Sequence, residues 1–128
     1  IVRDDEGSID PWKSYWSGEY LSADVRALGT YFVAIDTTAP EITPIGVKTG
    51  SKLQTGSDLT FIIKDDISGI DKYNGYINGK WVLVTHDAKR NRFEHEIEPG
   101  LEQGTHIFVL EVSDEKGNKS RFETTFIL

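Results

Sequence analysis

The sequence predicts an all-β protein built around an Ig-like or fibronectin-like antiparallel β-sandwich of about seven strands. From residue 40 onward, apolar and polar residues alternate with a period of two, and no stretch keeps the 3.6-residue period of an amphipathic helix. Turn-forming clusters recur at roughly 8–15-residue intervals, which is typical of the short strands of such sandwiches. An Asn-Gly pair at 78–79 adds a strong hairpin signal.

The first half of the sandwich is predicted from apolar segments separated by turns. A first strand is expected at 41–48, directly after Ala39-Pro40. In a second strand, Leu59, Phe61 and Ile63 alternate with Thr60, Ile62 and Lys64, so one face is strongly apolar. A loop at 65–69 separates it from a third strand at 70–77.

Asn78 and Gly79 predict a two-residue type I′ hairpin, because both residue types tolerate positive φ. A fourth strand is expected to return at 80–86. This register places Tyr76 opposite Trp81 and Gly75 opposite Val82.

Three strands complete the predicted sandwich. In the fifth, Phe93, His95 and Ile97 alternate with glutamates. The sixth, at 106–112, is apolar on both faces and is therefore expected at the centre of its sheet. A turn at 114–119, in which Gly117 is free to adopt a left-handed conformation, leads to the seventh strand at 122–128.

Residues 1–38 have a different character. The segment 4–8 is loop-like, and one strand is expected at 29–35. This is too little to close a core, so we expect 1–38 to be the tail of a preceding β-domain plus a linker, and 39–128 to form the sandwich. The chain lacks methionine, so we expect it to be either a mature, processed form or a piece cut from a larger exported protein.

The composition narrows the classes of function. The 128 residues include no cysteine, which excludes disulfides and thiolate metal sites. A net charge of −7 disfavours a nucleic-acid partner, because an acidic surface repels phosphates. No apolar run is long enough to predict a membrane span.

Several segments together resemble known families. The linker 36–42 (Asp-Thr-Thr-Ala-Pro-Glu-Ile), the loop 65–70 and the segments 104–106 and 112–118 resemble bacterial Ig-like repeats. The segments 77–83 and 87–92, with 28–31, are similar to the C-terminal β-domain of exported lysostaphin-type zinc endopeptidases from Bacteroidetes. The resemblance implies a parent enzyme, in the periplasm or at the cell surface, that cuts peptidoglycan cross-bridges. Zinc would belong to the missing catalytic domain.

The sequence itself holds no catalytic motif. The zinc-binding patterns His-x-x-x-Asp and His-x-His of that family do not occur, nor does Gly-x-Ser-x-Gly or a Walker loop. A zinc site assembled from His86, His95 and His106 is disfavoured, because His95 and His106 fall at inward-facing strand positions where backbone partners are expected. We therefore expect no enzyme activity and no cofactor in this chain, apart from a possible calcium ion.

Calcium is suggested by acidic residues at strand ends. If the strands alternate in direction, six side chains fall at the pole that faces the preceding domain, and calcium prefers six to eight oxygen ligands. The alternative is that each Asp caps its own turn. The candidates are Asp36, Asp65, Asp66, Asp87, Asp114 and Asn118.

Aromatic residues near the N-terminus suggest a second site, since aromatic rings stack on sugars. The alternative is packing against the preceding domain or the sandwich. The candidates are Trp12, Tyr15, Trp16 and Tyr20.

Two main functions remain open. The first is a non-catalytic accessory or spacer module of a cell-wall peptidase, which positions the catalytic domain or contacts the envelope. The second is a stand-alone cell-surface adhesion or carbohydrate-binding module. The expected partners are the preceding domain of the same chain and peptidoglycan or another glycan.

Overall fold

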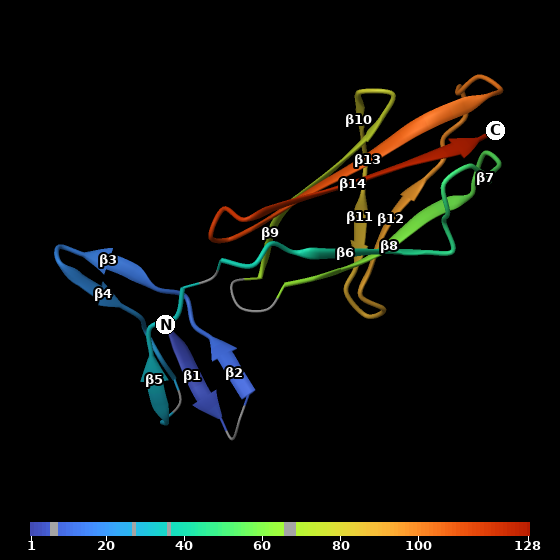
Figure 1. Cartoon of the computed structure of the whole chain (residues 1–128). Coiled ribbons are helices and arrows are strands. Elements are labelled where there is room, and N and C mark those ends of the chain that lie inside the picture. Colours follow the sequence, from blue (N-terminus) through green and yellow to red (C-terminus); the bar gives the residue numbers. More distant parts are fainter. Residues whose placement is uncertain (6–7, 27, 36, 66–68) are drawn as a thin grey trace.

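The computed structural model describes residues 1–5, 8–26, 28–35, 37–65 and 69–128. Within these residues every regular element is a strand (Figure 1). The described residues contain no helix that is long and apolar enough to cross a membrane. The predicted all-β class is confirmed.

Two sheets form the sandwich. In the described residues, the smaller sheet has the order β11 (Thr85–Asp87), β12 (Arg92–Glu96), β8 (Asp58–Lys64) and β6 (Glu41–Ile45). The larger sheet has the order β10 (Lys80–Val82), β9 (Ile70–Ile77), β13 (Thr105–Asp114), β14 (Lys119–Ile127) and β7 (Ser51–Lys52). Neighbouring strands pair antiparallel, except that β7 runs parallel to β14. Leaving aside the short β7 and β10, these orders match the ABED and CFG sheets of an Ig-like sandwich, so that prediction is confirmed.

Aromatic and aliphatic side chains fill the space between the sheets. Phe61 on β8 stacks on Phe108 on β13, with ring centroids 5.4 Å apart and planes 12° from parallel. Both residues have no exposed surface, and burying such a side chain stabilises the fold by roughly 1.5–3 kcal/mol. The alternation predicted for β8 is present, with Leu59, Phe61 and Ile63 all buried.

The central hairpin has the predicted turn and register. Asn78 and Gly79 have φ values of 50° and 82°, and Tyr76 pairs with Trp81 across β9 and β10. Strand β13 lies at the centre of its sheet, as expected. However, Ile107 on its outer face remains 43% exposed.

The prediction of a single strand at 80–86 is wrong. The segment forms two strands, β10 and β11, which belong to different sheets. The chain crosses between the sheets at Leu83 and Val84, where the Leu83 carbonyl accepts a hydrogen bond from His95 Nδ1 at 2.7 Å and Val84 is buried. Gly75 makes room for this crossing, because a Cβ there would lie 2.7 Å from Val84 Cγ2.

The N-terminal part contains more strands than the one expected. A sheet has the order β2 (Ser8–Pro11), β1 (Val2–Asp5) and β5 (Thr30–Phe32), and a separate hairpin joins β3 (Tyr15–Ser17) to β4 (Tyr20–Ser22). The loop expected at 4–8 is wrong for Asp4, Asp5 and Ser8, which lie in strands. Asp4 pairs with Ile9 and Thr30, and Asp5 pairs with Ser8, so backbone pairing outweighs the low strand propensity of aspartate. In Figure 1 the β3–β4 hairpin projects away from the sandwich.

Candidate functional site

Among the described residues, Asp114 is the most buried of the predicted acidic ligands. It ends β13 with 1% of its surface exposed. Its Oδ1 accepts hydrogen bonds from the backbone N–H groups of Lys116 and Asn118, both at 2.9 Å, and its Oδ2 accepts one from Asn118 Nδ2 at 2.8 Å. The carboxylate therefore caps the β13–β14 turn, in which Gly117 has the predicted positive φ of 84°.

Asp65 and Asp87 also bind within their own loops. Asp65 Oδ2 accepts a hydrogen bond from Gly69 N at 2.9 Å. Asp87 accepts one from Lys89 N at 3.1 Å and pairs with Arg90 Nε at 2.9 Å. The hydrogen bond from the Arg90 side chain holds the pKa of Asp87 below its ordinary value of 3.8.

The described acidic residues are not gathered into one ligand shell. Asp87 lies on an edge strand of the smaller sheet, whereas Asp114 ends the central strand of the larger sheet. Asp36 and Asp66 lie outside the described residues. Among those described, no group of three His, Asp or Glu side chains is placed to hold a metal ion. Calcium binding stays a prediction.

The three histidines serve separate contacts. His95 and His106 are buried and bound to backbone carbonyls, as predicted. His106 donates from Nε2 to Glu102 O at 2.7 Å and accepts at Nδ1 from Asn78 Nδ2 at 2.8 Å, which assigns its neutral tautomer. His86 is exposed and stacks on Phe93 at 4.2 Å.

The N-terminal aromatic residues do not share one face. Trp12 lies edge-on to Tyr31, with ring centroids 6.3 Å apart. In the hairpin register, Tyr15 and Tyr20 fall on one face and Trp16 on the other, because Tyr15 pairs with Ser22 and Trp16 with Leu21. These three hairpin residues are 51%, 76% and 72% exposed, respectively. The four rings do not form a single flat surface. Sugar binding by these residues stays a prediction.

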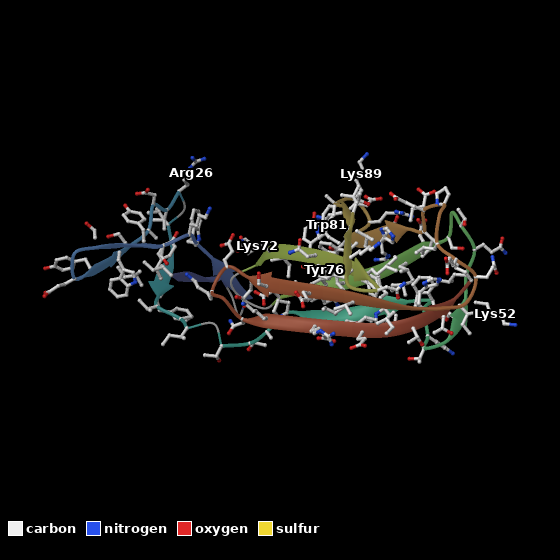
Figure 2. All side chains as sticks on the ribbon, turned by 90° about the horizontal axis from the view of Figure 1, so that it is seen from above. Arg26, Lys52, Lys72, Tyr76, Trp81 and Lys89 are labelled. Carbon is white, nitrogen blue, oxygen red and sulfur yellow. The ribbon has the colours of Figure 1, made fainter. Side chains whose placement is uncertain are left out.

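The outer face of the larger sheet carries a site that the sequence analysis did not identify. Trp81, Tyr76 and Val109 lie side by side in one row across β10, β9 and β13, and we call them the outer platform. Trp81 is 59% exposed, and its Nε1–H donates to Asn74 Oδ1 at 3.2 Å. Figure 2 labels Trp81, Tyr76 and Lys72 on this side of the molecule.

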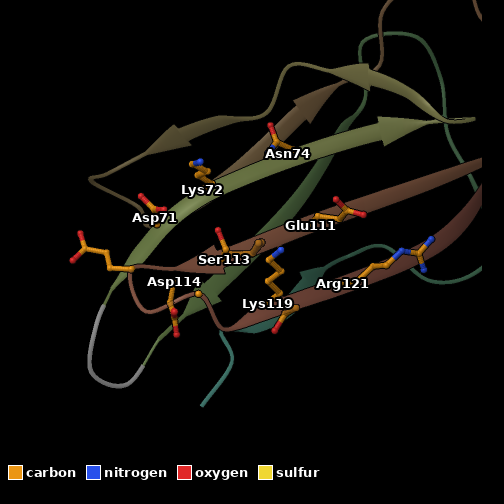
Figure 3. Close-up of a pocket in the computed structure, with 12 residues that line it drawn as sticks. Asp71, Lys72, Asn74, Glu111, Ser113, Asp114, Lys119 and Arg121 are labelled. Carbon is orange, nitrogen blue, oxygen red and sulfur yellow. The ribbon is translucent and has the colours of Figure 1, made fainter. Parts of the chain in front are cut away.

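A polar groove continues from the platform along the same face. It has a volume of about 760 Å³, and Asn74 lies at its border with the platform. Figure 3 shows side chains from three neighbouring strands around it, including Lys72 on β9, Glu111 on β13 and Lys119 on β14. The alternation along β9 was a signal for this face, since Lys72, Asn74 and Tyr76 are its outward positions.

The comparisons with known proteins find a distant structural likeness and no match in sequence. No protein-family model matches the chain, and no curated protein is similar to it in sequence. The structure is similar to the crystal structure of CopC from Methylosinus trichosporium OB3b, with a TM-score of 0.46 and 13% sequence identity. The match covers 62% of this chain and 83% of that chain. A likeness of this degree carries no functional inference.

Proposed function

We propose that the chain is a non-catalytic accessory module of an exported cell-wall peptidase of the lysostaphin type. In this proposal, the N-terminal hairpin docks on the adjoining domain of the same polypeptide, and the sandwich is the rigid support that positions it. The observation that carries the proposal is the exposure of Tyr15, Trp16 and Tyr20 on the β3–β4 hairpin.

This hairpin has the properties of an incomplete interface. An isolated two-stranded hairpin is at best marginally stable in water, and large exposed aromatics mark contact surfaces. Trp16 lies on one face and Tyr15 and Tyr20 lie on the other, so both faces offer apolar area to a partner. A partner domain that enclosed the hairpin would bury rings that usually dominate interface energies.

The sandwich supports the proposed non-catalytic role. Its interior is filled by stacked rings such as Phe61 and Phe108, and the described turn carboxylates Asp65, Asp87 and Asp114 are engaged in caps. The carbonyl of Pro40, where the chain enters the sandwich, accepts a hydrogen bond from the Ser120 hydroxyl on β14. This contact anchors the linker, as a positioning module requires.

The reading frame upstream of Ile1 provides the first test. His-x-x-x-Asp and His-x-His on a β-rich domain behind an export signal would support the proposal. Repeats of the Asp-Thr-Thr-Ala-Pro type without such ligands would overturn the peptidase assignment. That result would favour the second candidate, a surface spacer or adhesin, to which the anchored Pro40 linker is equally suited.

A binding measurement tests the docking itself. The upstream domain, produced separately, is titrated into this chain by calorimetry. We expect Trp16→Ala to weaken the complex by about tenfold, since buried interface tryptophans are common hot spots. The matched control is Trp81→Ala, which removes an indole ring from the sandwich instead of from the hairpin. It should leave the affinity for the upstream domain unchanged. Equal affinities for wild type and Trp16→Ala would contradict docking through the hairpin.

A further inference from the structure

The outer face of the larger sheet joins an aromatic surface to a polar groove, and none of the roles described above uses it. We propose that this face binds an oligosaccharide, with a sugar ring on the outer platform and its hydroxyl groups directed into the groove. The inference rests on the proposed function for its setting, a cell wall rich in glycan. It assigns a ligand to residues that the docking proposal leaves unused.

The platform is preorganised for stacking. Trp81, Tyr76 and Val109 are consecutive cross-strand neighbours, so their side chains emerge on one face of the sheet. The hydrogen bond from Trp81 Nε1 to Asn74 Oδ1 fixes the indole while leaving it 59% exposed. A ring that is already oriented loses little conformational freedom when a ligand covers it.

The groove supplies partners for hydroxyl groups. Asn74 lies beside the platform, and its Nδ2 group makes no hydrogen bond to the described part of the protein. Among the same residues, the side chains of Lys72, Glu111 and Lys119 form neither a hydrogen bond nor an ion pair. Amide, ammonium and carboxylate groups are therefore available to donate to and accept from a polyhydroxylated ligand.

The balance of charges and polarity favours a sugar over other ligands. The exposed acidic groups of the groove, Asp71, Glu111 and Glu115, match in number its cationic groups, Lys72, Lys119 and Arg121. With no excess of positive charge in a chain of net charge −7, the groove does not attract a polyanion. A purely apolar partner would bury these polar groups without hydrogen bonds, at a cost in free energy. The volume of about 760 Å³ is in the range of small-ligand sites.

The three indole N–H groups of the chain provide a direct test. ¹⁵N-labelled protein is titrated with chitotetraose, a soluble β-1,4-linked N-acetylglucosamine oligomer. The indole signals of Trp12, Trp16 and Trp81 are assigned from single alanine variants. We expect the Trp81 signal to shift during the titration and the Trp16 signal to stay in place. Trp81→Ala should weaken chitotetraose binding by about tenfold. The affinity of this variant is measured from the shifts of the backbone amide signals of β9 and β13.

A second variant separates loss of the site from loss of the fold. Asn74→Ala keeps the indole but removes its hydrogen bond and one groove amide, so it too should weaken chitotetraose binding, with an unchanged melting curve. A saturable shift of Trp16 alone, or no shift at millimolar chitotetraose, would overturn the inference. Docking of the upstream domain through Trp16 is tested independently, by the calorimetric titration with that domain.

Discussion

The sandwich and the β3–β4 hairpin use the same residue types on strands, but with opposite results. Phe108 on β13 has no exposed surface, because Phe61 of the facing sheet stacks on it. Trp16 on β3 is 72% exposed, because the described chain brings no second layer over either face of the hairpin. Strand formation therefore does not by itself bury an aromatic side chain. Burial requires a second sheet, and the hairpin would need another domain or partner to supply one.

The largest effect is expected from opening the core of the sandwich. Phe108→Ala should lower the free energy of unfolding by about 3–5 kcal/mol, because it removes a fully buried ring and leaves a cavity. Urea unfolding followed by tryptophan fluorescence measures this loss. Ile107→Ala is the matched control on the opposite face of β13, and it should cost much less. Similar losses for both variants would mean that the two faces are equally covered.

Removing the buried cap should have the next largest effect. Asp114→Ala leaves two backbone N–H groups and the Asn118 amide without their acceptor, which should cost about 3 kcal/mol. Chemical unfolding measures the change, with the exposed neighbour Glu115→Ala as the control. If chelating calcium lowers the stability of the wild-type protein, that result would support the predicted calcium site.

Gly75 tests how closely the sandwich is packed at the sheet crossing. Gly75→Ala should destabilise the fold by about 2 kcal/mol, because the new methyl group would overlap Val84 and approach Phe108. The additional substitution Val84→Ala should restore part of that loss in a double-mutant cycle. Strict additivity of the two single changes would show that they do not meet.

The pH dependence of the exposed Asp87–Arg90 pair should be small. Because the folded-state pKa of Asp87 is lowered, its contribution is present above the ordinary value of 3.8 and is lost as the pH falls through the folded-state pKa. Thermal melts of wild type and Asp87→Asn should differ slightly at pH 7 and converge at acid pH. The difference should also shrink with salt, since the Arg90 and Asp87 side chains are 65% and 40% exposed. A gap that persists in acid would point to a different cause.

The smallest effect on stability is expected in the hairpin. Trp16→Ala should change the free energy of unfolding of the sandwich by less than about 0.5 kcal/mol, because the ring touches none of its core. Circular-dichroism melts provide the measurement. A loss comparable to that of Phe108→Ala would show that the hairpin is already packed in solution, and the contrast between the two regions would disappear.

The sequence by itself determined the features that depend on local geometry. The period of two identified the buried face of β8, and the φ preferences of Asn78 and Gly79 determined the turn and register of the β9–β10 hairpin. These predictions succeed because side chains alternate along any strand and because few residues tolerate positive φ. The inward histidines followed from the same alternation.

Only the tertiary structure decided which surfaces meet. The strand expected at 80–86 divides between two sheets because Val84 enters the core against Gly75, a contact between residues of different elements. Trp16 and Trp81 both remain exposed on hairpins, and Trp81 contacts Asn74 at the border of a polar groove, which β9, β13 and β14 form beside it. Long-range strand pairing creates such surfaces, and no local period in the sequence encodes it.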